Sequence, residues 1–500
     1  MPARSARLRS PLVRALVVFL VAFIGLCILA GPERLTRPSH DNHYSWLAQG
    51  WLEGRLHHEG TPPGYCSSEL RRARKCRQHS YDDWARIWTL TLKDGSSVRG
   101  IPCKTEACEA RRRSDRVESW LLLGSTRVLR ELAPGEIVDR QETWYISFPP
   151  GPALAMLPSV ALRGTKARDV LITCLLGALI PVVLLRLFDR ERGLDDPARA
   201  REHLWAVAAW TFASPAAFVA ANGRVWFTAQ IVAALCLALY VSMSWRCHRP
   251  ALAGLALALA VSCRPHLAVA VLFFAAEWWR ETEGKQRWLT ALRFAAPLLV
   301  VGAMLMTYNM ARFDDPFEFG HRFLDIRWQK RMQEIGMFST SYLGRNLRCA
   351  FTLMPVWSHG AGPWPGTLLG MGPTTAWSPK VSLHGSNLLL GIPWLLLLLR
   401  GRERFPQRWG LIAAALAVAV PSLLYQNSGQ IQFSYRFAID WLPLLLPALV
   451  FSGGARRPWF PILVILAMAW QLHGAWWFGR APGLLFVTDP LGWPFESELQ

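Results

Sequence analysis

Long apolar segments separated by polar, often basic, loops run through most of the chain. A helix needs about 20 residues to cross a bilayer, and eleven segments come close enough to that length and apolarity to be predicted as crossings. They lie at 11–30, 170–188, 203–221, 224–244, 250–262, 266–279, 290–308, 387–400, 408–426, 439–452 and 459–478. The pattern predicts an all-α polytopic membrane protein built around a bundle of about eleven transmembrane helices.

Arginine-rich loops give the expected orientation. Five of them fall on one side of the membrane if the N-terminus is cytoplasmic, and the loops on that side are usually the basic ones. These loops are 186–201, 246–249, 280–287, 400–408 and 456–457. Residues 1–30 are predicted as a signal anchor, because their apolar part is too long for a typical cleavable signal. We expect a multi-pass protein of the inner (plasma) membrane with its active site on the extracytoplasmic side.

Two long segments then lie outside the cytoplasm, at 31–169 and 309–386. The transmembrane helices occupy 170–308 and 387–478, and residues 479–500 form an extracytoplasmic tail. Cytoplasmic loops are short by comparison, whereas transporters built from inverted repeats usually keep loops short on both faces. The working surface is therefore expected on the outer side.

Two juxtamembrane helices are predicted in the first outer segment. In 41–56, apolar and aromatic side chains follow the i, i+3, i+4, i+7, i+8 spacing of a helix lying on a surface; they are Tyr44, Leu47, Ala48, Trp51 and Leu52. Segment 148–162 is apolar but short and contains several prolines. A crossing there would reverse the orientation of nearly all the basic loops, so we predict an interfacial or re-entrant helix.

A polar insert, 57–142, lies between these helices. Residues 86–92 alternate in polarity and meet the turn-forming run 93–96, Lys-Asp-Gly-Ser. Alternation followed by such a turn is typical of a β-hairpin. The insert is therefore predicted to be a small β-containing domain.

Four of the ten cysteines lie in this insert. An oxidising compartment favours disulfides, and we predict Cys66–Cys76 with Cys103–Cys108, because each pair closes a short loop; four cysteines allow three pairings. Zinc is the alternative. Neither spacing is the CxxC form typical of zinc ribbons.

Composition supports the membrane class. Hydrophobic residues make up 52% of the chain and charged residues only 18%, while the net charge is +20. Such an excess of positive charge could indicate nucleic acid, but the basic residues gather at the ends of apolar segments, which is the distribution of basic membrane loops. We therefore expect no nucleic-acid partner.

Asp41 is the strongest catalytic candidate. It follows the first apolar segment by about ten residues and stands next but one to His43. A carboxylate at a membrane surface can act as a base toward a substrate lying in the lipid. The alternative is structural, because Asp is also a favoured N-cap for the helix that follows.

A second candidate site opens the second outer segment, in the run 308–322. Acidic, imidazole and guanidinium groups crowd together there, and Glu318, His321 and Arg322 are the candidates. Both charge signs are needed to hold a phosphate and to manage a proton. The alternative is that 314–316, Asp-Asp-Pro, only forms a turn and that Arg312 extends along apolar surface to reach water.

Further basic candidates lie between predicted crossings. Arg264 and His266 fall at the outer end of a helix pair, and a charged residue in such a place is a functional candidate, with Arg suited to a lipid phosphate. Tyr435 and Arg436 enter the same face. Alternatively, Arg436 forms an ion pair with Asp440.

Taken together, these features resemble the GT-C glycosyltransferases, which include the protein O-mannosyltransferases and the lipid A aminoarabinose transferases. The shared layout is an acid after the first span, a juxtamembrane helix, a proline-rich interfacial helix at 148–162 and a second large outer loop. The resemblance covers about residues 30 to 450 and rests on this layout and on two short strings, Tyr308-Asn309…Phe313…Pro316-Phe317-Glu318-Phe319-Gly320 and Gln432-Phe433…Tyr435-Arg436.

The resemblance implies an enzyme that takes a sugar from a polyprenyl-phosphate carrier and passes it to a lipid, glycan or protein acceptor at the membrane. Asp41 would be the base, or would order the acceptor and any metal, and Arg264 matches a residue that contacts the carrier phosphate in the aminoarabinose transferases. Many members carry a second acid directly after the first, whereas this chain has Asn42. A divalent cation therefore stays open, with Glu318 or His43 as the group that replaces the missing acid.

Two other classes of function fit the same pattern. A transporter or flippase for a lipid-linked glycan would also place charged residues between its spans. A non-catalytic scaffold would use the cysteine-bearing insert to bind a partner. Either class would tolerate the loss of Asp41 as a base, and the proposed enzyme would not.

Overall fold

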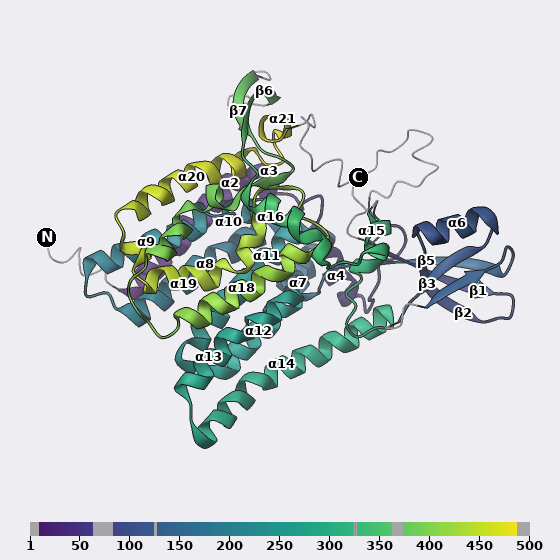
Figure 1. The fold of residues 1–500 in the computed structure, drawn as a ribbon, viewed down its shortest axis with the longest axis horizontal. Coiled ribbons are helices and arrows are strands. Elements are labelled where there is room, and N and C mark those ends of the chain that lie inside the picture. The colour runs from purple at the N-terminus through teal and green to yellow at the C-terminus, as the bar shows by residue number, and fades with distance from the viewer. Residues whose placement is uncertain are drawn as a thin grey trace. The chain divides into compact units, whose positions relative to one another are not determined.

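The computed structural model describes residues 10–63, 84–124, 128–324, 326, 328–362 and 374–487 (Figure 1). The chain divides into two compact units. The first, which we call the bundle unit, comprises Met1–Asp41, Arg168–Leu298 and Thr340–Gln500; the second, the sheet unit, comprises Asn42–Ala167 and Leu299–Ser339. The two units are described separately.

The bundle unit is almost entirely helical. Its α-helices are α2 (Pro11–Ala30), α3 (Pro32–Leu35), α8 (Asp169–Arg192), α9 (Pro197–Phe212), α10 (Ala216–Asn222), α11 (Val225–Ser244), α12 (Pro250–Cys263), α13 (Val271–Glu281), the first half of α14 (Gly284–Phe313), α16 (Leu343–Phe351), α17 (Leu388–Gly391), α18 (Arg408–Leu424), α19 (Leu442–Phe451), α20 (Trp459–Trp477) and α21 (Pro482–Leu485). Two short sheets accompany them, an antiparallel pair β6 (Val356–Gly362) and β7 (Thr374–Lys380), and a parallel pair β8 (His384–Ser386) and β9 (Gln432–Ser434).

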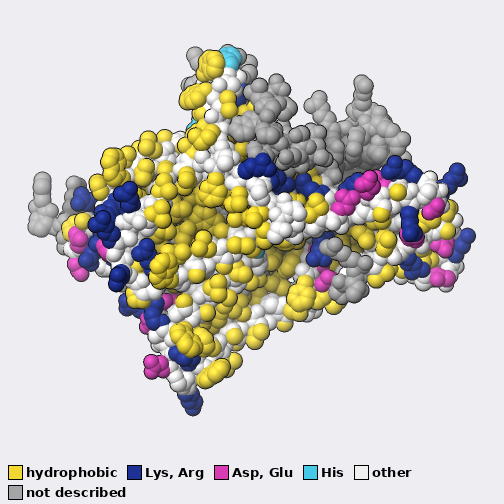
Figure 2. Space-filling model, viewed as in Figure 1, with side chains coloured by type: hydrophobic (Ala, Val, Ile, Leu, Met, Phe, Trp, Pro, Cys, Tyr) yellow, Lys and Arg dark blue, Asp and Glu magenta, His cyan; other side chains and the backbone are white. Residues whose placement is uncertain are grey.

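Five helices are long and apolar enough to cross a membrane. They are Pro11–Ala30, Asp169–Arg192, Val225–Cys247, Gly284–Phe313 and Trp459–Trp477 in the part of the chain that the structure describes. The bent pair α9–α10 would make a sixth. Apolar side chains are exposed over this unit, including Leu292, Leu416 and Leu466 (Figure 2). Burying such surface in lipid is favourable, so these helices have the character of membrane spans.

The predicted count of about eleven crossings is not confirmed. Each of the eleven segments is helical, but several are too short to cross as one α-helix. Prolines give the physical reason, because they remove a backbone donor and interrupt α-helical hydrogen bonding. Segment 266–279 opens with a 3₁₀ helix, Pro265–Ala270, and segment 387–400 is the short α17 followed by a 3₁₀ helix, Pro393–Arg400.

At the break between α9 and α10, side chains form hydrogen bonds with two backbone carbonyls. The two helices meet at an angle of 51°. Ser214 Oγ donates to the Trp210 carbonyl at 2.6 Å, and the indole N–H of Trp394 donates to the Ala213 carbonyl at 2.8 Å. A carbonyl without a partner would be costly in an apolar interior. The break therefore leaves both of these carbonyls satisfied.

A buried ionic trio joins three helices of the bundle unit. Arg14 Nε, in the first turn of α2, lies 3.2 Å from Asp189 Oδ2 near the end of α8. His203 Nδ1, on α9, lies 2.8 Å from the other oxygen of Asp189. All three side chains are almost inaccessible to solvent. This contact fixes one end of α2 against α8 and α9.

The sheet unit is built on a five-stranded antiparallel sheet in the order β4-β3-β2-β1-β5. The strands are β1 (Trp84–Leu92), β2 (Ser97–Pro102), β3 (Glu118–Leu122), β4 (Leu129–Leu132) and β5 (Ile137–Ile146). The predicted hairpin is confirmed as β1 and β2, with Leu90 opposite Val98. The sheet is larger than the prediction, because β5 pairs along the whole of β1 and continues past residue 142.

Helices complete this unit: α4 (His43–Leu52), α6 (Glu106–Ser114), α7 (Gly151–Arg163), α15 (Gln329–Glu334) and the second half of α14. The helices predicted at 41–56 and 148–162 correspond to α4 and α7. With 13 residues, α7 is about 20 Å long, which is shorter than the ~30 Å hydrocarbon core of a bilayer.

Arg312 lies in the last turn of α14, so the run that was expected to open a loop begins as helix. Its side chain is fully buried, contrary to the expectation that it extends toward water. The guanidinium donates to the Ile146 carbonyl at 3.0 Å and lies 4.0 Å from the centre of the Tyr308 ring. Arg312 thus fastens the end of α14 to β5.

Candidate functional site

Asp41 is buried at one end of the bundle unit, with 4% of its surface exposed. One carboxylate oxygen lies 3.1 Å from His40 Nδ1, and the other lies 3.8 Å from Arg224 Nε. The hydrogen bond to Asp41 raises the pKa of His40 above its ordinary value. The N-cap position of α4 belongs to Asn42, whose side chain makes no capping hydrogen bond. The catalytic and structural readings of Asp41 both stay predictions.

Several helix ends meet around Asp41. Arg34, just after α2, donates from Nη1 to the Ala221 carbonyl near the end of α10 at 3.4 Å, and from Nη2 to the Phe478 carbonyl after α20. Arg224 occupies the N-cap position of α11. These contacts bring the ends of α2, α10 and α20 and the start of α11 to one end of the bundle unit, as the predicted orientation of these spans requires.

Gly479 marks the point where two guanidiniums converge. A Cβ built on this glycine would lie 3.5 Å from Nη2 of Arg34 and 3.5 Å from Nη2 of Arg224, and its φ of +73° disfavours any side chain. Two guanidiniums and the amide oxygen of Asn222, at 3.8 Å from the same Cβ position, therefore lie within contact distance of this glycine. We call Asp41, Arg34, Arg224 and Gly479 the Asp41 cluster.

The charge of the Asp41 cluster favours an anion. Arg34 has no ion-pair partner among the described residues, and burial lowers its pKa to about 10, which still leaves it charged at neutral pH. Arg224 stands at the N-terminus of α11, where the helix dipole adds further positive potential. Arg480 lies nearby, but Glu33 neutralises it at 2.7 Å. The Asp41 cluster thus contains one carboxylate and two cations, an excess of positive charge that suits a phosphate.

Arg264 and His266 both contact the carboxylate of Asp440, which the sequence analysis had considered as an ion-pair partner of Arg436. Asp440 is buried, and its Oδ2 lies 2.8 Å from Arg264 Nη2 and 3.3 Å from His266 Nε2. The expected alternative, an ion pair between Arg436 and Asp440, is wrong. Arg436 instead donates to Gln230 Oε1 at 3.0 Å and to the Gly429 carbonyl at 3.1 Å.

These contacts change which arginine is the stronger candidate for binding a phosphate. Arg264 is already compensated by Asp440, whereas Arg34 in the Asp41 cluster is not. Tyr435, beside Arg436, is buried with its ring 5.9 Å from that of Phe437. We therefore regard the Asp41 cluster as the stronger anion site, and the roles of Arg264, His266, Tyr435 and Arg436 stay predictions.

In the sheet unit, Glu318, His321 and Arg322 belong to the segment that follows α14. Glu318 is buried and accepts from the Gly320 N–H at 2.7 Å, while Arg322 Nε lies 3.2 Å from its other oxygen. Burial raises the pKa of Glu318 and lowers that of His321 to about 4. A neutral His321 adds no positive charge at neutral pH, so its predicted role in holding a phosphate loses its electrostatic basis.

The acids before Glu318 have structural contacts. Asp314 pairs with Arg99 at 3.0 Å, and Asp315 accepts from the Phe317 N–H at 2.9 Å in a local turn. His43, the other predicted catalytic residue of this unit, is buried in α4 with its ring 5.1 Å from that of Trp84. The structural alternative thus accounts for 314–316.

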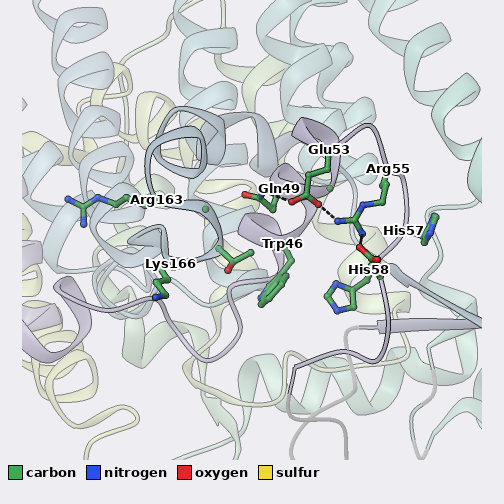
Figure 3. A pocket seen from close by; sticks show the side chains of 12 residues that line it. Trp46, Gln49, Glu53, Arg55, His57, His58, Arg163 and Lys166 are labelled. Atoms are coloured by element: carbon green, nitrogen blue, oxygen red, sulfur yellow. Dashed lines mark hydrogen bonds and ion pairs between the residues drawn. The ribbon is translucent and has the colours of Figure 1, made fainter.

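A cavity of about 570 Å³ opens in the sheet unit beside α4 and the end of α7 (Figure 3). One face of α4 contributes Trp46, Gln49, Gly50 and Glu53, which recur at helical spacing. The other walls come from residues 55–59 and from residues 163–166. None of these lining residues was singled out by the sequence.

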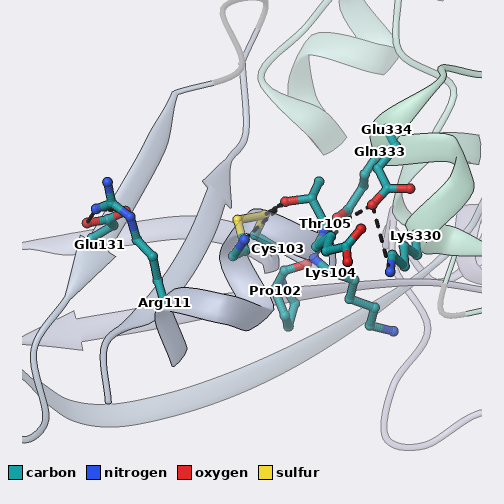
Figure 4. The surroundings of a disulfide bond; sticks show 11 residues. Pro102, Cys103, Lys104, Thr105, Arg111, Glu131, Lys330, Gln333 and Glu334 are labelled. Carbon is teal, nitrogen blue, oxygen red and sulfur yellow. Dashed lines mark hydrogen bonds and ion pairs between the residues drawn. A yellow bond between two sulfur atoms is a disulfide. The ribbon is translucent and has the colours of Figure 1, made fainter. Parts of the chain in front are cut away.

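The structure confirms one of the predicted disulfides. Cys103 and Cys108 are bonded, with Cα atoms 5.9 Å apart, whereas Cys66 and Cys76 lie outside the described residues (Figure 4). The bond closes the first turn of α6, where Thr105 accepts from the Cys108 N–H at 3.3 Å. The Lys104 N–H donates to Gln333 of α15 at 2.6 Å. Zinc at these two cysteines is therefore excluded.

Elsewhere in the described ranges, no group of three or more His, Cys, Asp or Glu side chains is placed to hold a metal ion. The divalent cation that the resemblance leaves open stays a prediction. No protein-family model, curated protein or solved structure matches this chain. Function must therefore be argued from the residues themselves.

Proposed function

We propose that this protein is an integral-membrane glycosyltransferase that moves a sugar from a polyprenyl-phosphate carrier to an acceptor, with Asp41 as the catalytic base. In this proposal the chain forms a GT-C-like bundle of about eleven crossings in the plasma membrane, and the reaction takes place on the extracytoplasmic side. The acceptor is a lipid, a glycan or a protein.

The observation that carries the proposal is the convergence of Arg34 and Arg224 beside Gly479, with the Asp41 carboxylate 3.8 Å from Arg224. Sugar transfer from a phosphate needs two kinds of group close together. One takes a proton from the attacking hydroxyl, and the other stabilises the phosphate that departs. The Asp41 cluster contains both.

The expected reaction follows from these groups. The acceptor oxygen forms a bond to the anomeric carbon of the sugar while the bond from that carbon to the phosphate oxygen breaks. The proton of the acceptor hydroxyl passes to Asp41, and the phosphate leaves with the bonding electron pair. Arg34 and Arg224 stabilise the charge that develops on it, because guanidiniums bind phosphate oxygens through two parallel donors.

The test is transfer from a radiolabelled polyprenyl-phosphate sugar in membranes that contain the wild type or Asp41→Asn, matched for protein level. Loss of a general base typically costs 10²- to 10⁴-fold, so we expect transfer to fall by about 100-fold or more. The matched control is Asp139→Asn, an exposed aspartate on β5, which should transfer normally. Equal transfer by Asp41→Asn and the wild type would remove Asp41 from the mechanism.

Arg224 gives a second and independent variant. Arg224→Lys keeps the charge but loses the two-donor geometry, and Arg224→Gln loses both. We expect kcat to fall in the order wild type, Arg224→Lys, Arg224→Gln, because the stabilised charge develops only during reaction. If the wild type transfers no sugar from any such donor, the transporter and scaffold alternatives replace the enzyme.

A further inference from the structure

The cavity of the sheet unit has a lining that is distinct in chemistry from the Asp41 cluster. It combines an indole, a side-chain amide, carboxylates and cations around about 570 Å³ of space, which lies within the usual size range of small-molecule sites. The following argument rests on this cavity alone and does not depend on a catalytic role for Asp41.

Trp46 forms a rigid apolar wall. Its indole N–H donates to Asn42 Oδ1 at 3.1 Å, and the ring of His58 meets it edge-on at 5.2 Å. The ring of His58 is itself packed against that of Trp84 of the sheet, with centroids 4.9 Å apart and planes tilted by 60°. Burial lowers the pKa of His58, so this histidine is neutral at pH 7. The indole face is thereby held in place before any ligand arrives.

Planar polar groups surround this wall. Gln49 Nε2 donates to Glu53 Oε1 at 2.6 Å, while Gln49 Oε1 reaches toward the backbone of Gly164 on the far wall. Arg55 lies between two carboxylates, paired with Glu53 and with Glu59. Figure 3 shows the Glu53–Arg55 pair on one side of Trp46 and Lys166 on the other.

Alternating donors and acceptors beside a flat apolar wall match a sugar. The C–H faces of a sugar ring pack against an indole, and its hydroxyls both donate and accept hydrogen bonds, as amide and carboxylate groups require. An inorganic anion would use the cations but would leave Trp46 and Gln49 without a role.

The charges add a preference for an acidic sugar. Three cations and two carboxylates line the cavity, so these five side chains together leave one positive charge. Arg55 is neutralised by its two glutamates, whereas Arg163 and Lys166 have no ion-pair partner in the described ranges. In Figure 3 the Arg163 guanidinium points away from Trp46, so we assign the acidic group to Lys166. We propose that this cavity binds an anionic carbohydrate, with the ring on Trp46 and the acidic group toward Lys166.

The experiment measures binding to the full-length protein in detergent by calorimetry, with no lipid-linked donor present. The probes are glucose 1-phosphate, glucuronate, glucose and inorganic phosphate. We expect glucose 1-phosphate and glucuronate to bind more tightly than glucose or inorganic phosphate. A preference for one acidic sugar over the other identifies the acidic group as phosphate or carboxylate.

Variants at Trp46 and Lys166 separate the contributions of the indole and of the positive charge to the affinity. Trp46→Ala should weaken both acidic sugars by about tenfold, the scale of losing one aromatic contact, while Trp46→Phe should keep most of the affinity. Lys166→Gln should weaken the acidic sugars and leave glucose unchanged. The controls are Trp409→Ala, an exposed tryptophan of the bundle unit, and Lys93→Gln in the β1–β2 turn, which should bind like the wild type.

Three results would overturn the proposal. They are the absence of binding of every probe, equal binding of inorganic phosphate and glucose 1-phosphate, and full affinity in Trp46→Ala. Because no sugar is transferred in this assay, its failure leaves the proposed enzyme untouched. A failed transfer assay equally leaves the binding result in place.

Discussion

One ion pair from the bundle unit and one from the sheet unit differ sharply in how far water reaches them. In the bundle unit, the Arg14 and Asp189 side chains are 8% and 4% exposed and share their contact with the buried His203. In the sheet unit, Arg111 and Glu131 form a shorter contact, 2.5 Å against 3.2 Å, but with 59% and 32% exposure. Water can replace a lost partner in the second case but not in the first, so the shorter distance does not imply the larger energy.

The source of stability differs accordingly. The sheet unit has apolar clusters within the sheet, such as Leu90, Trp120 and Leu132, and a disulfide across the first turn of α6. Its exposed ion pairs, such as Arg111–Glu131, contribute little. The bundle unit instead buries charges between helices, where removing one partner leaves the other unpaired.

The largest effect is expected from Asp189→Ala. This change leaves the buried Arg14 and His203 without their carboxylate, and breaking such a contact typically costs 3–5 kcal/mol. We expect the free energy of unfolding to fall by about 4 kcal/mol, measured by thermal or denaturant unfolding in detergent. Asp189→Asn, which keeps the hydrogen-bonding shape, should lose less. A loss below about 1 kcal/mol would mean that the two units do not differ as described.

A pH experiment on His321 sharpens the comparison, because it tests a half-buried titratable group of the sheet unit. Its pKa of about 4 lies below the ordinary 6.5, so the unfolded chain binds the proton more tightly. This contribution to stability is complete above pH 6.5 and is lost as the pH falls from 6.5 toward 4. Since one pH unit corresponds to about 1.4 kcal/mol, the loss approaches about 3 kcal/mol.

The measurement compares His321→Gln with its parent across this pH range. Both should carry Glu318→Gln, because burial raises the pKa of Glu318 and its protonation favours the folded state as the pH falls. The stability of the parent should decline more steeply than that of the His321 variant. Parallel curves would show that His321 takes up its proton in the folded protein without cost.

A smaller effect is expected from opening the disulfide. Replacing Cys103 and Cys108 by Ser removes a short covalent loop, for which the chain-entropy model gives about 2 kcal/mol. The loss should appear in the sheet unit, as faster hydrogen exchange in α6 and in β3. Reduction of the wild type should reproduce it. Unchanged exchange in α6 would contradict a stabilising role for this bond.

The smallest effect is expected from Glu131→Gln, which removes the exposed partner of Arg111. Exposed pairs contribute about 0.2–1 kcal/mol, and salt screens them. We expect a loss of about 0.5 kcal/mol that disappears at high ionic strength in a denaturant titration. If Glu131→Gln lowers the free energy of unfolding as much as Asp189→Ala does, the exposed Arg111–Glu131 pair and the buried Arg14–Asp189 pair contribute equally, which contradicts the comparison.

The sequence predicted the positions of the helices better than it predicted which parts of them are 3₁₀ rather than α-helical. The apolar segments mark most helices of the bundle unit, because burial from water depends on local composition, but α3, α16 and α21 lie outside them. The 3₁₀ segments at Pro265 and Pro393 were missed, since a proline can end a helix or only reshape it. The hairpin at 86–102 was found from its turn, but the pairing of β5 with β1 is a long-range contact that no local pattern records.

The candidate site shows the same limit. Asp41 stood out as an acid at a membrane surface, but its neighbours Arg34, Arg224 and Gly479 come from helix ends far apart in the chain. A signal was present, because Gly-Arg pairs at 223–224 and 479–480 put cations on the side where loops are usually less basic. From the sequence, Asp440 was considered as a partner of Arg436, which is the nearest arginine along the chain. In the structure Asp440 pairs with Arg264 instead.

The bend between α9 and α10 bears on motion. The carbonyls of Ala213 and Trp210 accept from Trp394 and Ser214, so the bent arrangement keeps both acceptors satisfied in an apolar interior. A bend stabilised in this way is a fixed joint rather than a hinge. Opening a path for a long lipid tail would then require movement of whole helices around this joint.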